Sequence, residues 1–302
     1  MDLGIIGLGR MGANMAARLV ERGHRVVGHD RSAHALTRAR EEGIEPAASL
    51  EALAAALPSP RAMWMMVPAG APVDATIDAL APLLARGDLI IDGGNSWYRD
   101  SMRRAEALQS KGIHYVDAGV SGGIWGRTEG YALMMGGDAG AVSRLTPIAE
   151  ALAPGTDRGW GHVGPSGAGH FVKMVHNGIE YGLMQAYAEG FAIMKAKAPL
   201  ELDLAQVASI WQHGSVVRSW LLDLTARALD KDQTLGAIAP WVDDSGEGRW
   251  TVQEAVDLNV AAPVITHSLI ARLESRDRES FGYRMLAALR AEFGGHAVRK
   301  DQ

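Results

Sequence analysis

The sequence of 302 residues is 47% hydrophobic and 22% charged, so it can form a large apolar core and most naturally folds as two domains. Its formal net charge of −5 comes without any tract of Lys and Arg, and we therefore expect no nucleic-acid partner. It has no cysteine, which excludes disulfides, thiolate zinc sites and a cysteine nucleophile. It begins with a strand pattern rather than a signal peptide and has no apolar run of membrane-spanning length, which predicts a cytoplasmic protein without a membrane partner.

Short apolar runs alternate with helical patterns up to about residue 160, as is typical of a parallel sheet whose strands are joined by helices. The predicted strands are Leu3–Ile6, Arg25–His29, Ala62–Val67, Leu89–Asp92, His114–Asp117 and Tyr131–Met135. Amphipathic helices are predicted between them, among them Met11–Arg22, which Gly23 ends, and Ala141–Leu152.

The pattern changes after the glycine-rich stretch Gly159–Gly169. From there to about Glu292 it is helical, with no convincing strand. The sequence thus predicts an α/β domain with a mostly parallel sheet over residues 1–163, followed by an all-α domain over residues 164–302.

Gly7, Gly9 and Gly12 form a GxGxxG motif that directly follows the first predicted strand and opens the first predicted helix. The first glycine permits a tight turn, the second lets the backbone approach a pyrophosphate, and the third allows close packing. A plain turn is the alternative, but the strand–loop–helix context favours a Rossmann-type site for NAD or NADP. The residues assigned to the cofactor are Gly7, Leu8, Gly9, Arg10, Met11, Gly12, Asp30, Arg31, Ser32, Val67, Pro68, Ala69 and Asn95.

The end of the second predicted strand carries opposing signals for the two cofactors. Asp30 stands where a carboxylate usually holds the ribose hydroxyls of NAD and repels a 2′-phosphate. Arg31 and Ser32 offer the cation and the hydroxyl that a 2′-phosphate prefers, although Arg31 could also be a solvated cation that covers the adenine. We expect both cofactors to be used, with a slight preference for NAD.

The segment KMVHNGIEY places Lys173, His176, Asn177 and Glu180 at the i, i+3, i+4, i+7 spacing of one helical face. The residues around them are apolar or small, which predicts a buried helix. Burying a lysine and a carboxylate is unfavourable unless the protein uses them. An internal Lys–Glu ion pair is the structural alternative.

Four further segments complete a known pattern: Asp92-Gly93-Gly94-Asn95-Ser96, Ser121-Gly122-Gly123, the helix from Lys173, and Arg290 to His296 in the tail. Together with the glycine motif they resemble decarboxylating 6-phosphogluconate dehydrogenase, a branch of the β-hydroxyacid dehydrogenases, over nearly the whole chain. At 302 residues the chain looks like the short form of that family. The resemblance implies oxidative decarboxylation of 6-phospho-D-gluconate to D-ribulose 5-phosphate and CO2, with reduction of NAD or NADP.

The resemblance also implies a role for each polar residue of the helix. Lys173 is the expected general base and then general acid, and burial can lower its pKa so that it is neutral when it takes a proton. Glu180 is the expected donor of the last proton to the enediol, while His176 and Asn177 fix substrate hydroxyls and the carboxylate. No metal is expected, because the sequence has no ligand motif, and the adjacent Asp243 and Asp244 are expected to cap a turn.

The substrate is expected to contact residues from both halves of the chain, namely Asn95, Ser121, Gly122, Gly123, Tyr181, Arg272, Arg290 and His296. Arg272 and Tyr181 resemble the family's phosphate ligands. Arg290 and His296 would come from the tail of a neighbouring subunit, which implies a homodimer or homotetramer. The structural alternative is a frayed, solvated terminus, which we would expect for a tail that lacks this pattern.

One segment departs from the family, since Ser245–Thr251 is shorter than in long members and lacks their loop lysine, which Arg249 could replace. Two other functions stay open. One is a dehydrogenase of small 3-hydroxy acids such as hydroxyisobutyrate, although that reaction requires neither Glu180 nor a phosphate site. The other is a dinucleotide-binding sensor without catalysis.

Overall fold

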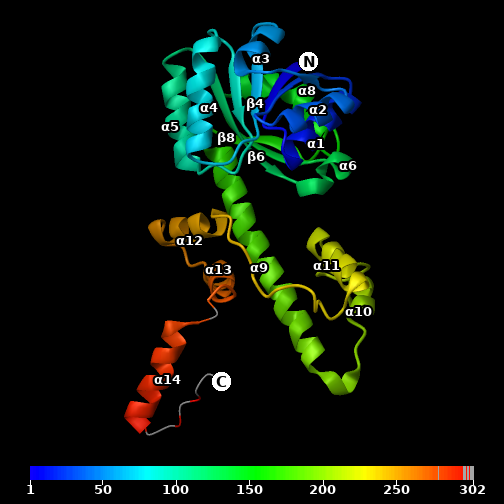
Figure 1. Cartoon of the computed structure of the whole chain (residues 1–302), viewed down its shortest axis with the longest axis vertical. Coiled ribbons are helices and arrows are strands. Elements are labelled where there is room, and N and C mark those ends of the chain that lie inside the picture. Colours follow the sequence, from blue (N-terminus) through cyan, green and yellow to red (C-terminus); the bar gives the residue numbers. More distant parts are fainter. Residues whose placement is uncertain (278, 295–296, 298, 300–302) are drawn as a thin grey trace. The chain divides into compact units, whose positions relative to one another are not determined.

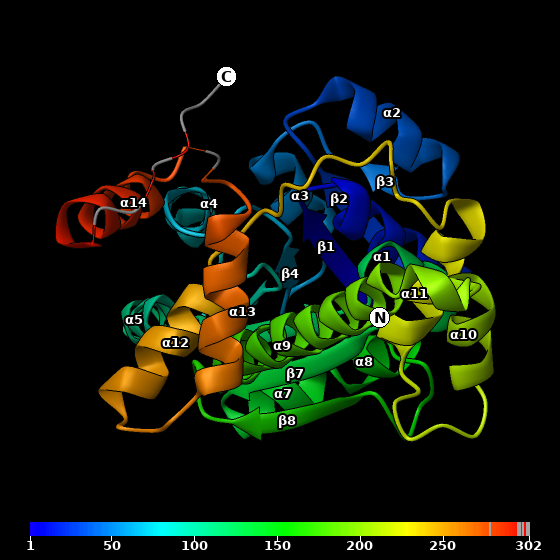
Figure 2. The same cartoon turned by 90° about the horizontal axis from the view of Figure 1, so that it is seen from below.

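The computed structural model describes residues 1–277, 279–294, 297 and 299, and the chain divides into two compact units, unit 1 (residues 1–177) and unit 2 (residues 178–302). In unit 1, the described residues form one eight-stranded sheet in the order β3-β2-β1-β4-β5-β6-β7-β8 (Figure 2). The strands are β1 (Asp2–Ile6), β2 (Arg25–His29), β3 (Glu45–Pro46), β4 (Ala62–Met65), β5 (Leu89–Asp92), β6 (His114–Ser121), β7 (Ala132–Gly137) and β8 (Trp160–Gly164). All neighbouring pairs are parallel except β6 with β7. The strand order reverses at β1 and β4, and ligands bind beside such a reversal in open α/β sheets.

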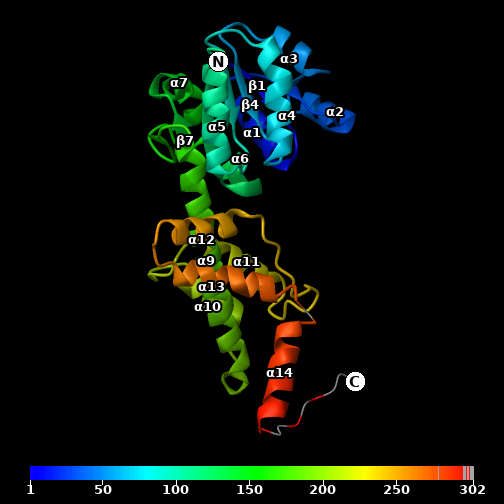
Figure 3. The ribbon, with the colours of Figure 1, turned by 90° about the vertical axis from the view of Figure 1, so that its left-hand side faces the viewer.

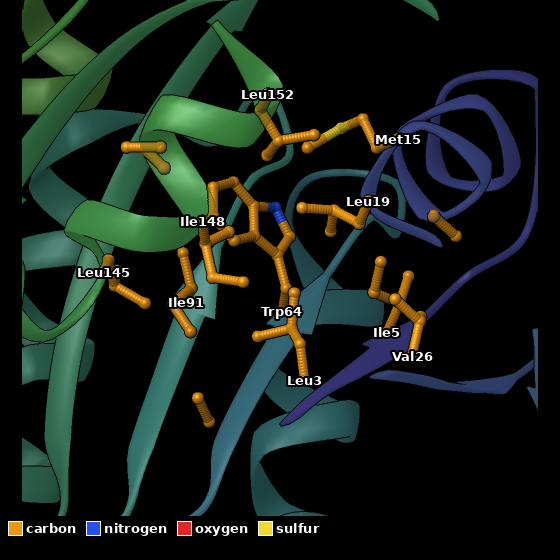
Figure 4. Close-up of a cluster of buried hydrophobic side chains, with 14 of the residues drawn as sticks. Leu3, Ile5, Met15, Leu19, Val26, Trp64, Ile91, Leu145, Ile148 and Leu152 are labelled. Carbon is orange, nitrogen blue, oxygen red and sulfur yellow. The ribbon is translucent and has the colours of Figure 1, made fainter. Parts of the chain in front are cut away.

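Helices cover both faces of this sheet. They are α1 (Arg10–Glu21), α2 (Ala33–Glu41), α3 (Leu50–Ala56), α4 (Ala71–Leu80), η1 (Ala81–Leu83), α5 (Tyr98–Gln109), η2 (Gly123–Trp125), α6 (Gly126–Glu129), α7 (Ala139–Arg144) and α8 (Thr146–Leu152). Side chains of α1, α2, α7 and α8 pack on one face, and those of α3, α4 and α5 on the other. The ribbon shows α1 and α2 on one side of the sheet and α4 and α5 on the other (Figure 1). Trp64 of β4 lies in the first of these two cores, with Leu19 and Ile148 nearby (Figure 4). The strands are apolar on both sides because both faces are covered.

α9 (Ala168–Ala196) begins in unit 1 and continues into unit 2. The other helices of unit 2 are η3 (Ala198–Leu200), α10 (Leu204–Trp211), α11 (Trp220–Lys231), α12 (Glu247–Asp257), α13 (Pro263–Glu274) and α14 (Phe281–Gly294), and its described residues contain no strand. Phe191 of α9 packs with α10 and α11 in a small apolar core, and α12 packs against α13 (Figure 3). Nowhere in the described chain is a helix both long enough and apolar enough to cross a membrane.

The predicted fold class is confirmed, and several details of the predicted elements are wrong. The predicted helix Ala141–Leu152 is two helices, α7 and α8, because Pro147 lies in the first turn of α8 and has no N–H for a continuous helix. The strands β3 and β8 were not predicted, since β3 has two residues and the half-exposed β8 has the sequence Trp-Gly-His-Val-Gly, without an apolar run. β6 continues to Ser121 because its second half pairs with β7.

The predicted burial of α9 is confirmed for Lys173 and Asn177 of the polar stripe and is wrong for part of the apolar side. Lys173 and Asn177 on the polar stripe are 6% and 8% exposed, whereas Ile179 and Leu183 on the apolar side are 52% and 46% exposed. The spacing shows which residues share a face, but it does not show which face is covered. Within one chain the buried residues of this segment include Lys173 and Asn177 of the stripe and also Met174, whereas His176 and Glu180 are half-buried.

Candidate active site

The three glycines of the motif, Gly7 and Gly9 in the loop after β1 and Gly12 in the first turn of α1, are glycine for different structural reasons. Gly7 has a φ of +92°, and a Cβ there would lie 2.4 Å from the carbonyl oxygen of Met66. A Cβ on Gly12 would lie 2.0 Å from the carbonyl oxygen of Gly7, so helix and loop require a glycine. A Cβ on Gly9 would meet nothing within 4 Å, so the chain itself does not require a glycine there. This open space at the amino end of α1 fits the pyrophosphate of a dinucleotide.

Asp30 ties the end of β2 to the glycine loop. Its Oδ2 accepts a hydrogen bond from the Leu8 amide at 2.7 Å, and its Oδ1 accepts one from the Ser32 amide at 2.8 Å. The Ser32 hydroxyl accepts from the Ala35 amide and caps α2, while Arg31 is exposed. Each carboxylate oxygen keeps a second lone pair, so Asp30 can still accept from a ribose hydroxyl.

Two more loops begin at the same edge of the sheet. Val67, Pro68 and Ala69 follow β4, and Asn95 follows β5. The buried carboxylate of Asp92 accepts hydrogen bonds from the Gly94 amide at 3.1 Å and the Ser96 hydroxyl at 2.7 Å. This fixed turn leaves Asn95 exposed at the edge. The sequence prediction gave Asp92 no role, although a carboxylate before Gly-Gly at the end of a strand was a usable signal.

The first turn of α9 is held against β6. The carboxylate of Asp117 accepts hydrogen bonds from the amides of Gly167 at 2.7 Å and His170 at 2.9 Å. Burial raises the pKa of Asp117, while the nearby His170 and these amides oppose the rise. A Cβ on Gly119 would lie 2.4 Å from the Cβ of Lys173. Glycine on the strand therefore lets α9 approach closely enough to bury Lys173.

The Ser121 turn and the α9 helix meet one turn beyond Lys173. The Ser121 hydroxyl lies 3.3 Å from His176 Nε2, and His176 Nδ1 lies 3.0 Å from the amide oxygen of Asn177. An amide oxygen only accepts, so Nδ1 donates to Asn177, and the other ring nitrogen, Nε2, lies within hydrogen-bond distance of the Ser121 hydroxyl. Gly122 and Gly123 have φ of +140° and +52°, which favours glycine at both. The structure thus joins Ser121, His176 and Asn177 in one hydrogen-bonded row.

In unit 2, the two predicted phosphate ligands contact each other. The guanidinium carbon of Arg272 lies 3.4 Å from the centre of the Tyr181 ring, and Arg272 Nη1 donates to the carbonyl oxygen of Asp243 at 2.8 Å. The Tyr181 hydroxyl lies 3.1 Å from the hydroxyl of Ser245, which in turn donates to the buried carboxylate of Glu247. Ser245 and Glu247 were not predicted as site residues, because no pattern connects them with a tyrosine 64 positions away in the sequence.

Two further predicted residues belong to unit 2, and a third lies outside the described residues. Glu180 is a half-buried residue of α9 in unit 2, and Arg290 is exposed on α14. His296 lies outside the described residues. Asp244 accepts a hydrogen bond from the Gly246 amide at 3.0 Å, as expected for a turn cap, and it pairs with Arg249.

Two family models together match most of the chain. The NAD binding domain of 6-phosphogluconate dehydrogenase matches residues 2–162, and the C-terminal domain of 6-phosphogluconate dehydrogenase matches residues 169–299. The nicotinamide dinucleotide predicted from the glycine loop is therefore the cofactor type of this chain.

Individual proteins that are similar to this chain carry the same family name. An NAD(+)-dependent, decarboxylating 6-phosphogluconate dehydrogenase of Haloferax volcanii is 47% identical over 303 residues, which cover 100% of both chains. An NADP(+)-dependent, decarboxylating enzyme of Bacillus subtilis is 40% identical over 92% of this chain and 62% of its own length. The solved 6-phosphogluconate dehydrogenase of Plasmodium falciparum superposes with a TM-score of 0.84 at 31% identity, and this chain covers 66% of that protein. The chain belongs to the 6-phosphogluconate dehydrogenase family.

Proposed function

We propose that this chain catalyses the oxidative decarboxylation of 6-phospho-D-gluconate to D-ribulose 5-phosphate and CO2. The observation that carries the proposal is the buried Lys173 beside the hydrogen-bonded row of Ser121, His176 and Asn177. The full-length likeness to the Haloferax enzyme supports the same reaction. When bound, the nicotinamide accepts the hydride from carbon 3 of the sugar acid.

Lys173 performs the proton transfers at carbon 3. As a neutral amine it takes the proton of the hydroxyl while the hydride leaves, and as an ammonium it then donates to the oxygen of the resulting ketone. The electrons of the breaking bond to CO2 pass into the enediol, which this proton stabilises. Ser121, His176 and Asn177 orient the substrate's hydroxyls and carboxylate. Their mutual hydrogen bonds fix their side chains before substrate arrives.

Glu180 gives the last proton to carbon 1 of the enediol. It lies seven residues beyond Lys173 on α9, so a regular helix carries both on one face, about 10 Å apart along its axis. Arg272 and Tyr181 hold the phosphate, with the guanidinium pre-oriented on the tyrosine ring.

The cofactor preference and the assembly are part of the same proposal. We assign residues 1–163 to cofactor binding and residues 164–302 to substrate binding and subunit contacts. Both NAD and NADP serve, with a slight preference for NAD, because Asp30 favours a free ribose diol while Arg31 and Ser32 suit a 2′-phosphate. The enzyme is a homodimer or homotetramer in which Arg290 and His296 of one subunit complete the site of its neighbour.

One assay series tests these assignments. The purified enzyme is given 6-phosphogluconate with NAD and then NADP, and both reduced cofactor and CO2 are measured. We expect both products in equal amounts with either cofactor. Turnover of 3-hydroxyisobutyrate without turnover of 6-phosphogluconate contradicts the proposed reaction. A thousandfold preference for one cofactor contradicts the interpretation of Asp30 and Arg31.

A further inference from the structure

Helix α5 carries two buried polar side chains that have no part in the proposed proton transfers. Ser101 is 0% exposed and Arg104 is 2% exposed. They are three residues apart and therefore lie on the same side of the helix. Each contacts a different segment that leads to predicted site residues.

Ser101 holds the first turn of α9. Its hydroxyl lies 2.7 Å from Nδ1 of the buried His170, which is the third residue of α9 and comes three residues before Lys173. Beside this contact, the rings of Tyr98 and Phe171 meet edge to face at 5.2 Å. Since Asp117 binds the amide of the same His170, α5 and β6 fix this turn from two sides.

Arg104 joins two loops at the carboxyl edge of the sheet. Its Nη1 lies 3.5 Å from the buried carboxylate of Asp92, which organises the turn that carries Asn95. Its Nη2 donates at 3.2 Å to the carbonyl oxygen of Gly70, the residue directly after Val67–Ala69. Its Nε binds Asp74, in the first turn of α4, at 2.9 Å. One guanidinium therefore spans both loops assigned to the cofactor.

We propose that Ser101 and Arg104 are positioning residues, Ser101 for Lys173 through His170, and Arg104 for the cofactor loops through Asp92 and Gly70. The inference rests on the proposed function, because it presumes that Lys173 and these loops act in catalysis. One helix then sets the distance between the base and the hydride acceptor. The effect is large because a misplacement of about 1 Å can lower a rate by roughly 10²-fold.

The first test replaces Ser101 with alanine and with threonine. Ser101→Ala is expected to lower kcat by about 10-fold or more and to leave the KM of the cofactor within about twofold of the parent's. The primary isotope effect on kcat, measured with substrate deuterated at carbon 3, is expected to be larger than in the parent enzyme. A loss of folded enzyme alone would lower the rate without changing the isotope effect. Ser101→Thr keeps the hydroxyl and is expected to restore kcat. The matched control is Ser110→Ala, an exposed serine that caps the end of the same helix.

A second readout of Ser101 does not depend on turnover. Amide hydrogen exchange in residues 168–174 is expected to be about 10-fold faster in Ser101→Ala than in the parent or in Ser110→Ala. Absence of turnover in the parent enzyme contradicts the proposed function, and this exchange measurement still decides the role of Ser101. Unchanged exchange, or a parental kcat and isotope effect in an active enzyme, overturns that role.

The second test compares Arg104→Gln with Arg103→Gln. Arg103 is the neighbour on the same helix, is 58% exposed and pairs with Asp74 and Asp100 at the surface. Arg104→Gln is expected to raise the cofactor Kd, measured by titration calorimetry without substrate, by about 10-fold or more, while Arg103→Gln stays within about twofold. If Arg104→Gln does not fold, Arg104→Lys carries the same expectation, because lysine keeps the charge and loses the fork that spans both loops. A parental Kd in the folded variant overturns the role of Arg104.

Discussion

Unit 1 and unit 2 hold their predicted site residues in different ways. In unit 1 the loops and the start of α9 are fixed by the buried carboxylates of Asp92 and Asp117 and are flanked by two large apolar cores. In unit 2, the described residues form a small core around Phe191, and most of the large apolar side chains that the described chain exposes belong to this unit. Exposed apolar surface on this scale is typical of a protein–protein interface. We therefore expect the proposed cofactor-binding unit to be complete within one chain and the proposed substrate-binding unit to be covered by a second chain.

The strongest way to break the site of unit 1 is to remove its proposed base, Lys173. Lys173→Met keeps the length of the buried side chain but cannot take a proton, so kcat is expected to fall by at least roughly 10³-fold. The cofactor Kd is expected to stay within about twofold, because the glycine loop is untouched. Steady-state kinetics and calorimetry check both values. Near-parental kcat would remove Lys173 from the mechanism.

Glu180→Gln tests whether the part of α9 in unit 2 contributes chemistry as well as binding. The amide cannot donate the last proton, so kcat is expected to fall by roughly 10²-fold. The loss is smaller than for Lys173 because water can still protonate the enediol. The measurement is kcat with 6-phosphogluconate, and a matched control is Glu189→Gln, an exposed residue farther along α9 that is hydrogen-bonded to Gln185. Parental activity of Glu180→Gln would assign the proton to another group.

The comparison also explains which features could be predicted from the sequence. The glycine loop, the strands and the Lys173 stripe are local patterns with fixed periods, and the predicted Rossmann-type fold and family are confirmed. The roles of the individual site residues stay predictions. The partnership of Tyr181 with Ser245 could not be predicted, because it depends on how α12 packs against α9.

Buried polar residues are the main feature that the sequence does not predict. No sequence motif distinguishes Asp117, Ser101 or Arg104. Each side chain contacts its partner only in the folded chain, because the partner belongs to another strand, helix or loop. A polar residue in an amphipathic helix is normally assigned to solvent. The burial of such a residue becomes visible only in the folded chain, as for Ser101 and Arg104 of α5.

Arg272→Ala tests the binding role of unit 2 separately from the chemistry of unit 1. Loss of a charged contact to the phosphate is expected to raise the KM for the sugar-phosphate substrate by about 10- to 100-fold, with a much smaller effect on kcat. Arg276→Ala is the control, since its partner Asp244 also pairs with Arg249, and its KM for the same substrate is expected to stay within about twofold of the parent's. Equal KM values for the two variants would remove Arg272 from the phosphate site.

A double substitution on α14 tests whether unit 2 is covered by a second chain. Leu286 and Leu289 are 57% and 55% exposed, and aspartate at both is expected to lower the mass in solution to that of one chain, as measured by light scattering. Turnover is expected to fall by about 10-fold or more, because Arg290 no longer reaches a neighbour, while the cofactor Kd stays parental. An unchanged mass, or a monomer with full activity, contradicts the shared site.

The smallest expected effects come from two glycines of unit 1, where one substitution is expected to affect cofactor binding and the other the stability of the fold. Gly9 has φ −65° and ψ −171°, which alanine adopts readily, and its added Cβ meets no protein atom. Gly9→Ala is therefore expected to change the free energy of unfolding by less than about 0.5 kcal/mol while weakening cofactor binding about 10-fold. Gly12→Ala is the counterpart, because its Cβ would overlap the carbonyl oxygen of Gly7 and is expected to destabilise the fold by about 1–3 kcal/mol. Urea unfolding and calorimetry distinguish the two. If Gly9→Ala bound cofactor normally, the open space beside Gly9 would not be the pyrophosphate site, and unit 1 would have to hold its cofactor elsewhere along the edge of the sheet.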